Sequence, residues 1–238
     1  MTPEQLKLSI LQSAFQGKLT GECLPNETAD DLYQQIQSEK QRLISEKKIK
    51  KEKPLPPITE EDIPFDIPDT WKWVRLGEVI DVRDGTHDTP GYVVKGIPLV
   101  TSKNLSNGKI DFSSAKFISE EDAFKINQRS RVDNQDILFA MIGTIGNPVL
   151  VKKDREFCIK NMALFKPINL QLTFMTYVFY FLQYIQQKLK KEMNGGVQIF
   201  VSLKSLRRLL FPLPPLTEQQ RIVAKLEELL PLVDQYGD

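Results

Sequence analysis

The most regular hydrophobic pattern lies near the C-terminus, between residues 216 and 235. Apolar residues recur there at spacings of four, three and four, which is typical of a helix that packs against a second helix. These seam positions are Ile222, Leu226, Leu229 and Val233. Thr217 followed by Gln220 predicts a capping box at the start of the helix, and Pro231 predicts a bend near its end. The pattern leaves a second interpretation open, in which the helix packs only on its own domain.

The charged residues of this segment fall on the other face of the helix, and we expect them to point to solvent. They are Glu218, Arg221, Lys225, Glu227 and Glu228. Residues 4–19, at the opposite end of the chain, also have an amphipathic pattern, with Leu6, Ile10 and Ala14 on the apolar side. We therefore expect the two terminal segments to form an antiparallel, coiled-coil-like arm.

A second helix is predicted to begin at Thr28, and its later part is strongly basic. Residues 39–53 contain seven Lys or Arg against three Glu. Such a run is usually a solvated helix face, and the alternative is an arm that contacts phosphates or a partner. Five prolines follow within residues 54–70, so this stretch is expected to be an extended linker.

Residues 71–211 have a different pattern, in which short runs rich in Val, Ile and Phe alternate with Gly, Asn and Asp turns. The runs predict strands at 78–82, 97–101, 137–142, 149–152, 163–165 and 209–211. Residues 172–193 have an apolar face with helical spacing and predict one helix. We therefore predict an α+β fold. Its parts are an N-terminal helical region (1–53), a linker (54–70), a β-rich domain with packed helices (71–211) and a C-terminal helix (212–238).

Composition limits the function more than the fold. The 238 residues are 41% hydrophobic and 26% charged with a net charge of +1, so nucleic-acid contacts require local clusters of Lys and Arg. Two cysteines far apart and a single histidine suggest neither a zinc site nor a disulfide framework. We read no signal peptide and no membrane segment, and we expect a cytoplasmic protein.

The residue patterns of DNA-modifying enzymes are not found either. A DNA adenine methyltransferase needs an Asn/Asp-Pro-Pro-aromatic tetrad, and Asn147-Pro148-Val149 lacks the second proline and the aromatic residue. A common type of metal-dependent nuclease needs Asp/Glu-x-Lys, and only Glu46-Lys47-Lys48 has that triplet, in the charged helix. We therefore assign no catalytic and no metal-binding residue, which favours a binding module.

Polar loops within residues 71–211 are the best candidates for contacts with DNA. The turn of residues 84–90 follows a strand and contains donors, acceptors and the single imidazole, although a plain capped turn is the alternative. Arg side chains suit guanine or phosphate, Asn suits adenine, and glycines let backbone N–H groups approach phosphate. The candidate DNA-binding residues are Thr86, His87, Lys103, Asn104, Arg129, Arg131, Gly143, Thr144, Lys160, Asn161, Gln198 and Lys204.

Three segments of the chain resemble one known family, the specificity subunits of type I restriction-modification systems. Residues 212–222, Pro-Leu-Pro-Pro-Leu-Thr-Glu-Gln-Gln-Arg-Ile, are similar to the run P-L-P-P-L-x-E-Q-x-R-I that follows each target recognition domain of that family. Residues 6–19 resemble its L-K-x-S-I-L-Q-x-A-x-x-G-K-L segment, and residues 64–77 resemble its I-P-x-x-W-x-x-x-x-L-G entry into a recognition domain. The resemblance covers nearly the whole chain, with one recognition domain where a complete subunit has two.

This resemblance implies a non-catalytic subunit of a host-defence system. Its β-rich domain would read one half of a bipartite target in double-stranded DNA, and its helices would bind methyltransferase subunits and, through them, restriction subunits. No cofactor is expected on this chain, and S-adenosylmethionine, ATP and Mg are expected in the partner subunits. A half-subunit could restore the second domain by forming a homodimer. Two other functions stay open: a helical scaffold without specific DNA binding, and a self-contained methyltransferase or endonuclease.

Overall fold

The computed structural model describes residues 1–21, 27–143, 145–193 and 200–235. Its α-helices are α1 (Pro3–Phe15), α2 (Ala29–Ser45), α3 (Leu76–Val79), α4 (Glu120–Ser130), α5 (Met175–Met193), α6 (Leu203–Arg208) and α7 (Leu216–Gln235). Two 3-10 helices are η1 (Glu60–Asp62) and η2 (Ser102–Asn104). The strands are β1 (Lys72–Arg75), β2 (Ile80–Asp84), β3 (Tyr92–Val93), β4 (Ile97–Val100), β5 (Leu105–Ser106), β6 (Lys109–Ile110), β7 (Lys116–Ile118), β8 (Ile137–Ala140), β9 (Gly146–Leu150), β10 (Cys158–Ile159), β11 (Met162–Pro167) and β12 (Leu210–Leu213). The predicted α+β class is confirmed.

The chain forms two compact units, each built from separate stretches of sequence. Unit 1 comprises Met1–Ile80, Pro167–Tyr184 and Arg207–Asp238, and unit 2 comprises Asp81–Lys166 and Ile185–Leu206. The sequence analysis predicted four consecutive segments, at residues 1–53, 54–70, 71–211 and 212–238, which differ in expected function. The two units differ in their internal packing, so the four segments stay a prediction.

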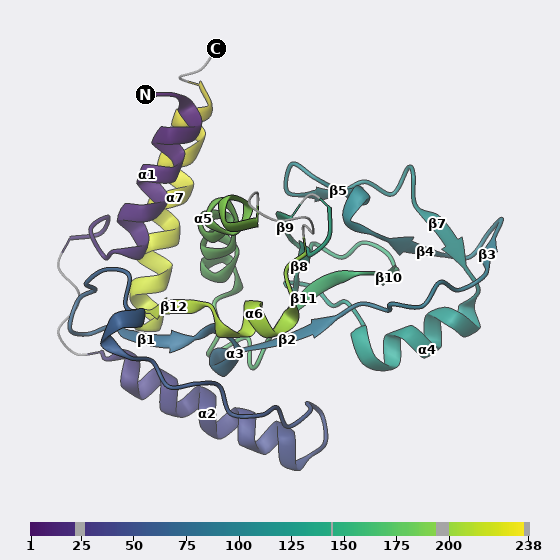
Figure 1. Cartoon of the computed structure of the whole chain (residues 1–238), viewed down its shortest axis with the longest axis horizontal. Coiled ribbons are helices and arrows are strands. Elements are labelled where there is room, and N and C mark those ends of the chain that lie inside the picture. Colours follow the sequence, from purple (N-terminus) through teal and green to yellow (C-terminus); the bar gives the residue numbers. More distant parts are fainter. Residues whose placement is uncertain (22–26, 144, 194–199, 236–238) are drawn as a thin grey trace. The chain divides into compact units, whose positions relative to one another are not determined.

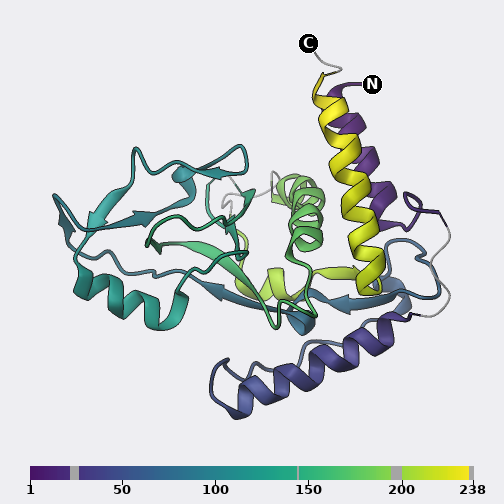
Figure 2. The same ribbon diagram turned by 180° about the vertical axis from the view of Figure 1, so that it is seen from behind.

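Helices α1 and α7 lie side by side in unit 1 and run antiparallel, as both views of the chain show (Figures 1 and 2). Of the apolar residues predicted to face the partner helix, Ile222, Leu226 and Val233 are buried, and Leu6, Ile10 and Leu229 are partly buried. Three of the four seam residues of α7 therefore lie on its buried face, and the coiled-coil-like arm stays a prediction. Pro231 lies inside the helix, which continues to Gln235.

Aromatic side chains form the centre of unit 1. Phe15, at the end of α1, is fully buried, and its ring centroid lies 5.3 Å from that of Tyr177 and 5.6 Å from that of Phe181. The Phe181 ring contacts Phe211 of β12 at 4.9 Å, edge to face. The Tyr177 hydroxyl donates to the Pro212 carbonyl oxygen at 3.0 Å. Offset and edge-to-face contacts of this kind favour one packing arrangement, so they fix α5 against α1 and β12.

The start of α7 differs from the sequence prediction in two ways. The helix begins at Leu216, so Thr217 is not its cap, and the Thr217 hydroxyl donates instead to Glu27 Oε2 at 2.5 Å. Glu218 was expected at the surface and is 2% exposed. Its carboxylate is paired with Arg221 Nη1 at 2.6 Å and accepts a hydrogen bond from the Thr20 hydroxyl. The expected capping box and the outward position of Glu218 were therefore wrong. Thr217 and Glu218 instead form hydrogen bonds with Glu27 and Thr20, which lie far away in the sequence.

Within unit 1, the proline-rich segment is bonded to strand β1 through Arg75. Strand β1 pairs with β12 in antiparallel register, with Arg75 opposite Leu210. The Arg75 guanidinium donates to the carbonyl oxygens of Pro56 and Pro57 at 3.3 and 3.2 Å and to Asp62 Oδ2 at 2.8 Å. Residues 54–70 are mostly without regular structure, as predicted, but these hydrogen bonds fix the course of the segment.

Two four-stranded sheets organise unit 2. One has the order β2-β11-β8-β9, and the other has the order β10-β4-β7-β3, with β10 and β4 parallel. Buried apolar residues from both sheets meet in one cluster that includes Val100, Leu138 and Leu164. The predicted strands at 97–101, 137–142 and 163–165 correspond to β4, β8 and β11, whereas the strand predicted at 78–82 is displaced to 80–84 by the short helix α3. Continuous apolar runs were thus easier to place than short or amphipathic ones.

Helix α4 was not predicted from the sequence. Ser119 caps it by accepting a hydrogen bond from the Asp122 amide at 3.1 Å. Only Ala123 and Ser130 of the helix are buried. Its buried side lies near β10, where the Cys158 thiol is 3.7 Å from the Ala123 carbonyl oxygen. Most of the helix is polar and solvated, so few apolar residues mark it in the sequence.

Candidate nucleic-acid interface

Strand β2 ends at Asp84, and the chain turns there against β10. The amides of Gly85 and Thr86 donate to the carbonyl oxygens of Met162 and Ile159, each at 3.0 Å. A Cβ atom on Gly85 would lie 2.5 Å from the Ile159 carbonyl oxygen, so glycine is required for this approach. The sequence therefore places the polar turn of residues 84–90 directly beside the end of β10.

Side chains from the two segments meet at this turn. The backbone N–H of Asn161 donates to the Thr86 carbonyl oxygen at 3.1 Å, and the side-chain oxygen Oδ1 of Asn161 lies 3.0 Å from His87 Nδ1. Asn161 adopts a positive φ of 54°, which asparagine tolerates better than most residues. The Lys160 ammonium group donates to the Thr89 hydroxyl. Four predicted residues, Thr86, His87, Lys160 and Asn161, are thus brought together.

Asp84 connects this turn to helix α4. Its Oδ2 lies 2.7 Å from His87 Nε2, and its Oδ1 accepts a hydrogen bond from Arg129 Nη2. Burial opposes ionisation of Asp84, but the hydrogen bonds from Arg129 and His87 outweigh it and lower the pKa of the carboxyl. The Asp84 side chain is 12% exposed, while those of His87 and Arg129 are 58% and 62% exposed. A buried carboxylate therefore binds two donors that reach solvent.

We refer to Asp84, His87, Arg129, Lys160 and Asn161 as the turn cluster. It combines a guanidinium fork bonded to Asp84, an imidazole that contacts Asp84 and Asn161, and the ammonium group of Lys160, the residue before Asn161. With His87 neutral, Arg129 and Lys160 against Asp84 give the cluster a formal charge of +1. Guanidinium groups bind phosphates or guanine through two hydrogen bonds, and amides can pair with adenine. The cluster is therefore suited to an anionic ligand that also has hydrogen-bonding edges.

Four more predicted residues are exposed in other segments of unit 2. Lys103 lies in η2, and Lys204 lies on α6. Arg131 follows α4, and its Nε is 3.4 Å from Asp133 Oδ1. Gly143 occupies the turn between β8 and β9 with a φ of +75°. These positions reach solvent, and their role in binding stays a prediction.

Asn104 has a different environment from the one expected. It is 3% exposed, and its Oδ1 accepts hydrogen bonds from the Thr101 amide and hydroxyl at 2.9 and 3.0 Å. Its Nδ2 donates to the Asp111 carbonyl oxygen at 3.0 Å and to Ser114 Oγ at 3.1 Å. All hydrogen-bonding positions of the amide are occupied by protein. Asn104 therefore holds the loop around β5 and β6 together, and we leave it out of the proposed DNA surface.

Two predicted residues, Thr144 and Gln198, lie outside the described residues. Asp84 was part of the predicted turn but was not predicted to contact Arg129, which is 45 residues later. The available signal was the sequence Ser119-Glu120-Glu121-Asp122, which is typical of a helix start and would have placed Arg129 near a helix end.

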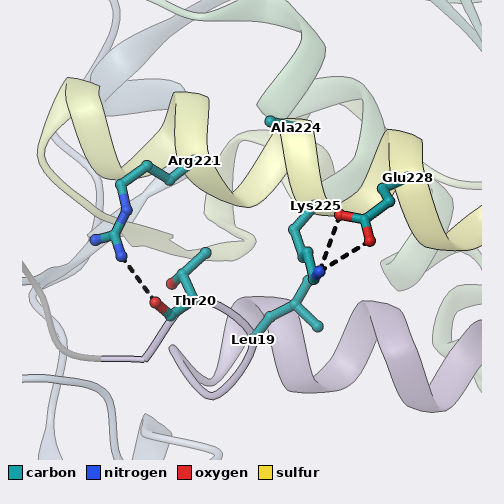
Figure 3. Close-up of a pocket in the computed structure, with 6 residues that line it drawn as sticks. All are labelled: Leu19, Thr20, Arg221, Ala224, Lys225 and Glu228. Carbon is teal, nitrogen blue, oxygen red and sulfur yellow. Dashed lines mark hydrogen bonds and ion pairs between the residues drawn. The ribbon is translucent and has the colours of Figure 1, made fainter.

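An open hollow of about 370 Å³ lies in unit 1 between α7 and the segment that follows α1 (Figure 3). Its lining residues are Leu19, Thr20, Arg221, Ala224, Lys225 and Glu228. Arg221 Nη2 donates to the Thr20 carbonyl oxygen at 2.8 Å, and Lys225 Nζ is 2.9 Å from Glu228 Oε2. Lys225 and Glu228 thus pair with each other and Arg221 bonds to the Thr20 backbone, and we assign no ligand to the hollow.

Among the residues that the structure describes, no three His, Cys, Asp or Glu side chains are arranged to hold a metal ion. Likewise, none of the helices placed by the structure has the length and apolar character needed to cross a membrane.

The fold and the turn cluster define an α+β protein with a polar, cationic candidate site on the loops of its second unit. Residues 68–234 match the model of a family described as the type I restriction modification DNA specificity domain. The chain therefore belongs to this family, as the segments at residues 6–19, 64–77 and 212–222 had indicated.

Curated relatives and solved structures agree with this assignment. The chain is 31% identical over 240 residues to the specificity subunit of the type I restriction enzyme EcoAI from Escherichia coli, covering 95% of this chain and 40% of the relative. It is 43% identical over 81 residues to the EcoEI specificity subunit of the same organism, covering 34% of this chain and 14% of that protein. The HsdS subunit from Thermoanaerobacter tengcongensis has a similar fold, with a TM-score of 0.57 and 21% identity over 98% of this chain and 50% of that one. The chain thus spans half or less of the length of these proteins.

Proposed function

We propose that this chain is a non-catalytic specificity subunit, or half of one, that reads one half of a bipartite target in double-stranded DNA. The turn cluster is the observation that carries the proposal, because it gathers at one exposed turn side chains of the types that bind base edges and phosphates. Membership of the DNA specificity family supports the choice of DNA as the ligand. The protein would act in the cytoplasm, where the target DNA lies.

Each member of the turn cluster has a distinct part in this proposal. Arg129 carries donors toward base edges, and each correct base contact contributes about 1–3 kcal/mol of discrimination. His87 would contact DNA with its ring while its two nitrogens stay bonded to Asp84 and Asn161. Lys160 is a compact charge suited to a phosphate, which fixes position without reading sequence. Asn161 is suited to adenine. Thr86, Lys103, Arg131, Gly143, Thr144, Gln198 and Lys204 are proposed as further contacts.

The helices of unit 1 have a separate proposed role. The antiparallel pair α1 and α7 would form a coiled-coil-like arm that sets the distance to a second recognition domain and docks methyltransferase subunits. That second domain would come from another part of a longer protein or from a second copy of this chain. S-adenosylmethionine, ATP and Mg would be used by the methyltransferase and restriction subunits, and this chain would recognise the target sequence.

Methylome sequencing tests the proposal. The chain is expressed in cells that lack other DNA methyltransferases, together with the methyltransferase subunit with which it assembles, and methylated motifs are determined. We expect one split motif that requires this chain. Arg129→Ala should relax or change the motif, whereas Lys125→Ala, which removes an exposed cation from the same helix, should leave it unchanged.

Two outcomes would contradict the proposal. A purified chain that methylates or cuts DNA without any added subunit would be a self-contained enzyme. A complex that methylates DNA without any dependence on this chain would leave it a scaffold, and binding should then lack the steep salt dependence that several phosphate contacts produce.

A further inference from the structure

The carboxylate of Asp84 joins three segments of unit 2 through its two oxygens. Oδ1 accepts from Arg129 at the end of α4, and Oδ2 accepts from His87 in the turn after β2. His87 in turn faces Asn161, in the connection between β10 and β11, through its second ring nitrogen at 3.0 Å. One buried residue therefore sets the positions of two exposed ones.

These contacts limit how the two donors can move. An arginine on a solvated helix samples many rotamers, and ordering it on binding costs conformational entropy. The bond from Nη2 to Asp84 removes much of that freedom before a ligand arrives and leaves the other guanidinium donors available. The contact between Oδ2 and Nε2 similarly fixes the orientation of the His87 ring.

We propose that Asp84 is a positioning residue of the turn cluster, which holds Arg129 in the geometry for reading bases, holds the His87 ring in place beside it, and does not itself contact DNA. The inference rests on the proposed function and adds to it a determinant of specificity. The burial of Asp84, against the exposure of its two partners, assigns it the supporting position.

The charge of Asp84 has a second consequence. A carboxylate beside Arg129 reduces the attraction of the cluster for any phosphate, whatever the sequence. It therefore weakens binding to incorrect DNA while it orders the groups that recognise correct DNA, which is how specificity increases without a large gain in affinity. Loss of the Asp84 charge should therefore weaken binding to DNA with the correct sequence and strengthen binding to DNA without it.

The test compares Asp84→Asn with Asp88→Asn in the complex with the methyltransferase subunit. Asp88 lies on the same turn and is exposed, and its backbone amide donates to the Thr86 hydroxyl, so it is a control for lost charge. Binding is measured over a range of salt concentrations to a duplex with the motif found by methylome sequencing and to an unrelated duplex. For Asp84→Asn we expect about tenfold weaker binding to the first and several-fold tighter binding to the second, with a steeper salt dependence for the second. Asp88→Asn should change both affinities in the same direction and keep their ratio.

Further variants separate positioning from a general structural role. In an Arg129→Ala, His87→Ala background, Asp84→Asn should have no further effect on the affinity ratio, because its two partners are gone. Asp84→Glu should recover part of the ratio, since it restores the charge. The inference is wrong if Asp84→Asn leaves the ratio unchanged, or if both affinities fall together with the thermal stability. Failure of the wild-type complex to distinguish the two duplexes would instead contradict the proposed function.

Discussion

Arg221 on helix α7 donates a hydrogen bond from Nη2 to the carbonyl oxygen of Thr20, 201 residues earlier in the chain, at 2.8 Å. The same guanidinium group pairs through Nη1 with the buried carboxylate of Glu218. Replacing Arg221 by Ala removes the positive partner of Glu218 and leaves the Thr20 carbonyl without this donor. We expect the free energy of unfolding to fall by about 2 kcal/mol, below the full cost of a broken buried pair because Arg221 is partly exposed.

Chemical denaturation of the purified chain measures this loss. Lys225→Ala is the matched control, because Lys225 lies one turn later on α7 and pairs with Glu228 at the surface. That variant should change stability by less than about 1 kcal/mol. Equal effects of the two substitutions would show that the buried position of Glu218 has no energetic importance.

The seam of α7 gives a second prediction, which uses two leucines of the same helix. Leu226 is fully buried and Leu232 is 56% exposed. Leu226→Ala should lower the free energy of unfolding by about 3 kcal/mol, through lost apolar burial and the cavity that remains. Leu232→Ala should change it by less than about 0.5 kcal/mol. Urea denaturation of both variants gives the comparison, and a larger loss for Leu232→Ala would contradict the packing of α1 against α7.

The sequence predicted this helix well because its signal is local and repeated. Ile222, Leu226 and Val233 recur at helical spacing, and all three lie on the buried face of α7. Strand β8 was predictable for a related reason, since all four of its residues are apolar and buried. The strands β3, β5, β6 and β10 have only two residues each, which is too short for any alternation to be recognised.

The candidate site was only partly predictable because its geometry is not local. The turn of residues 84–90 was identified by composition, but its contacts come from segments far along the chain, such as Arg129 and Asn161. Thr217 and Glu218 were misplaced for the same reason. Their hydrogen-bond partners, Glu27 and Thr20, are about 190 residues or more away, so no local pattern indicates them.

Cys158 gives a prediction about chemical reactivity. Burial, with a smaller contribution from the charge of Glu156, raises the pKa of its thiol from 9.0 to about 11. At pH 8 the thiolate fraction should therefore be about 100-fold lower than for an ordinary cysteine, and thiolate is the reactive form. In a Cys23→Ser variant, a maleimide should react very slowly with the folded protein and rapidly once urea unfolds it. Reaction with the folded protein should accelerate as the pH rises toward 11. Fast labelling of the folded protein at pH 8 would contradict the buried position of Cys158.

Lys103 and Asn104 are neighbours in the sequence and should respond to substitution in opposite ways. Asn104 makes four hydrogen bonds inside unit 2, so Asn104→Ala leaves buried polar groups without partners and should cost about 2 kcal/mol of stability. Because its amide does not face DNA in our proposal, the methylated motif of the protein that still folds should be unchanged. Lys103 is exposed, so Lys103→Ala should change stability by less than about 0.5 kcal/mol and weaken DNA binding with a shallower salt dependence.

Thermal unfolding, salt-dependent binding and methylome sequencing of both variants test the pair. A changed motif with unchanged stability for Asn104→Ala would place its amide at a base edge, and the loop around β5 and β6 would then have to open when DNA binds.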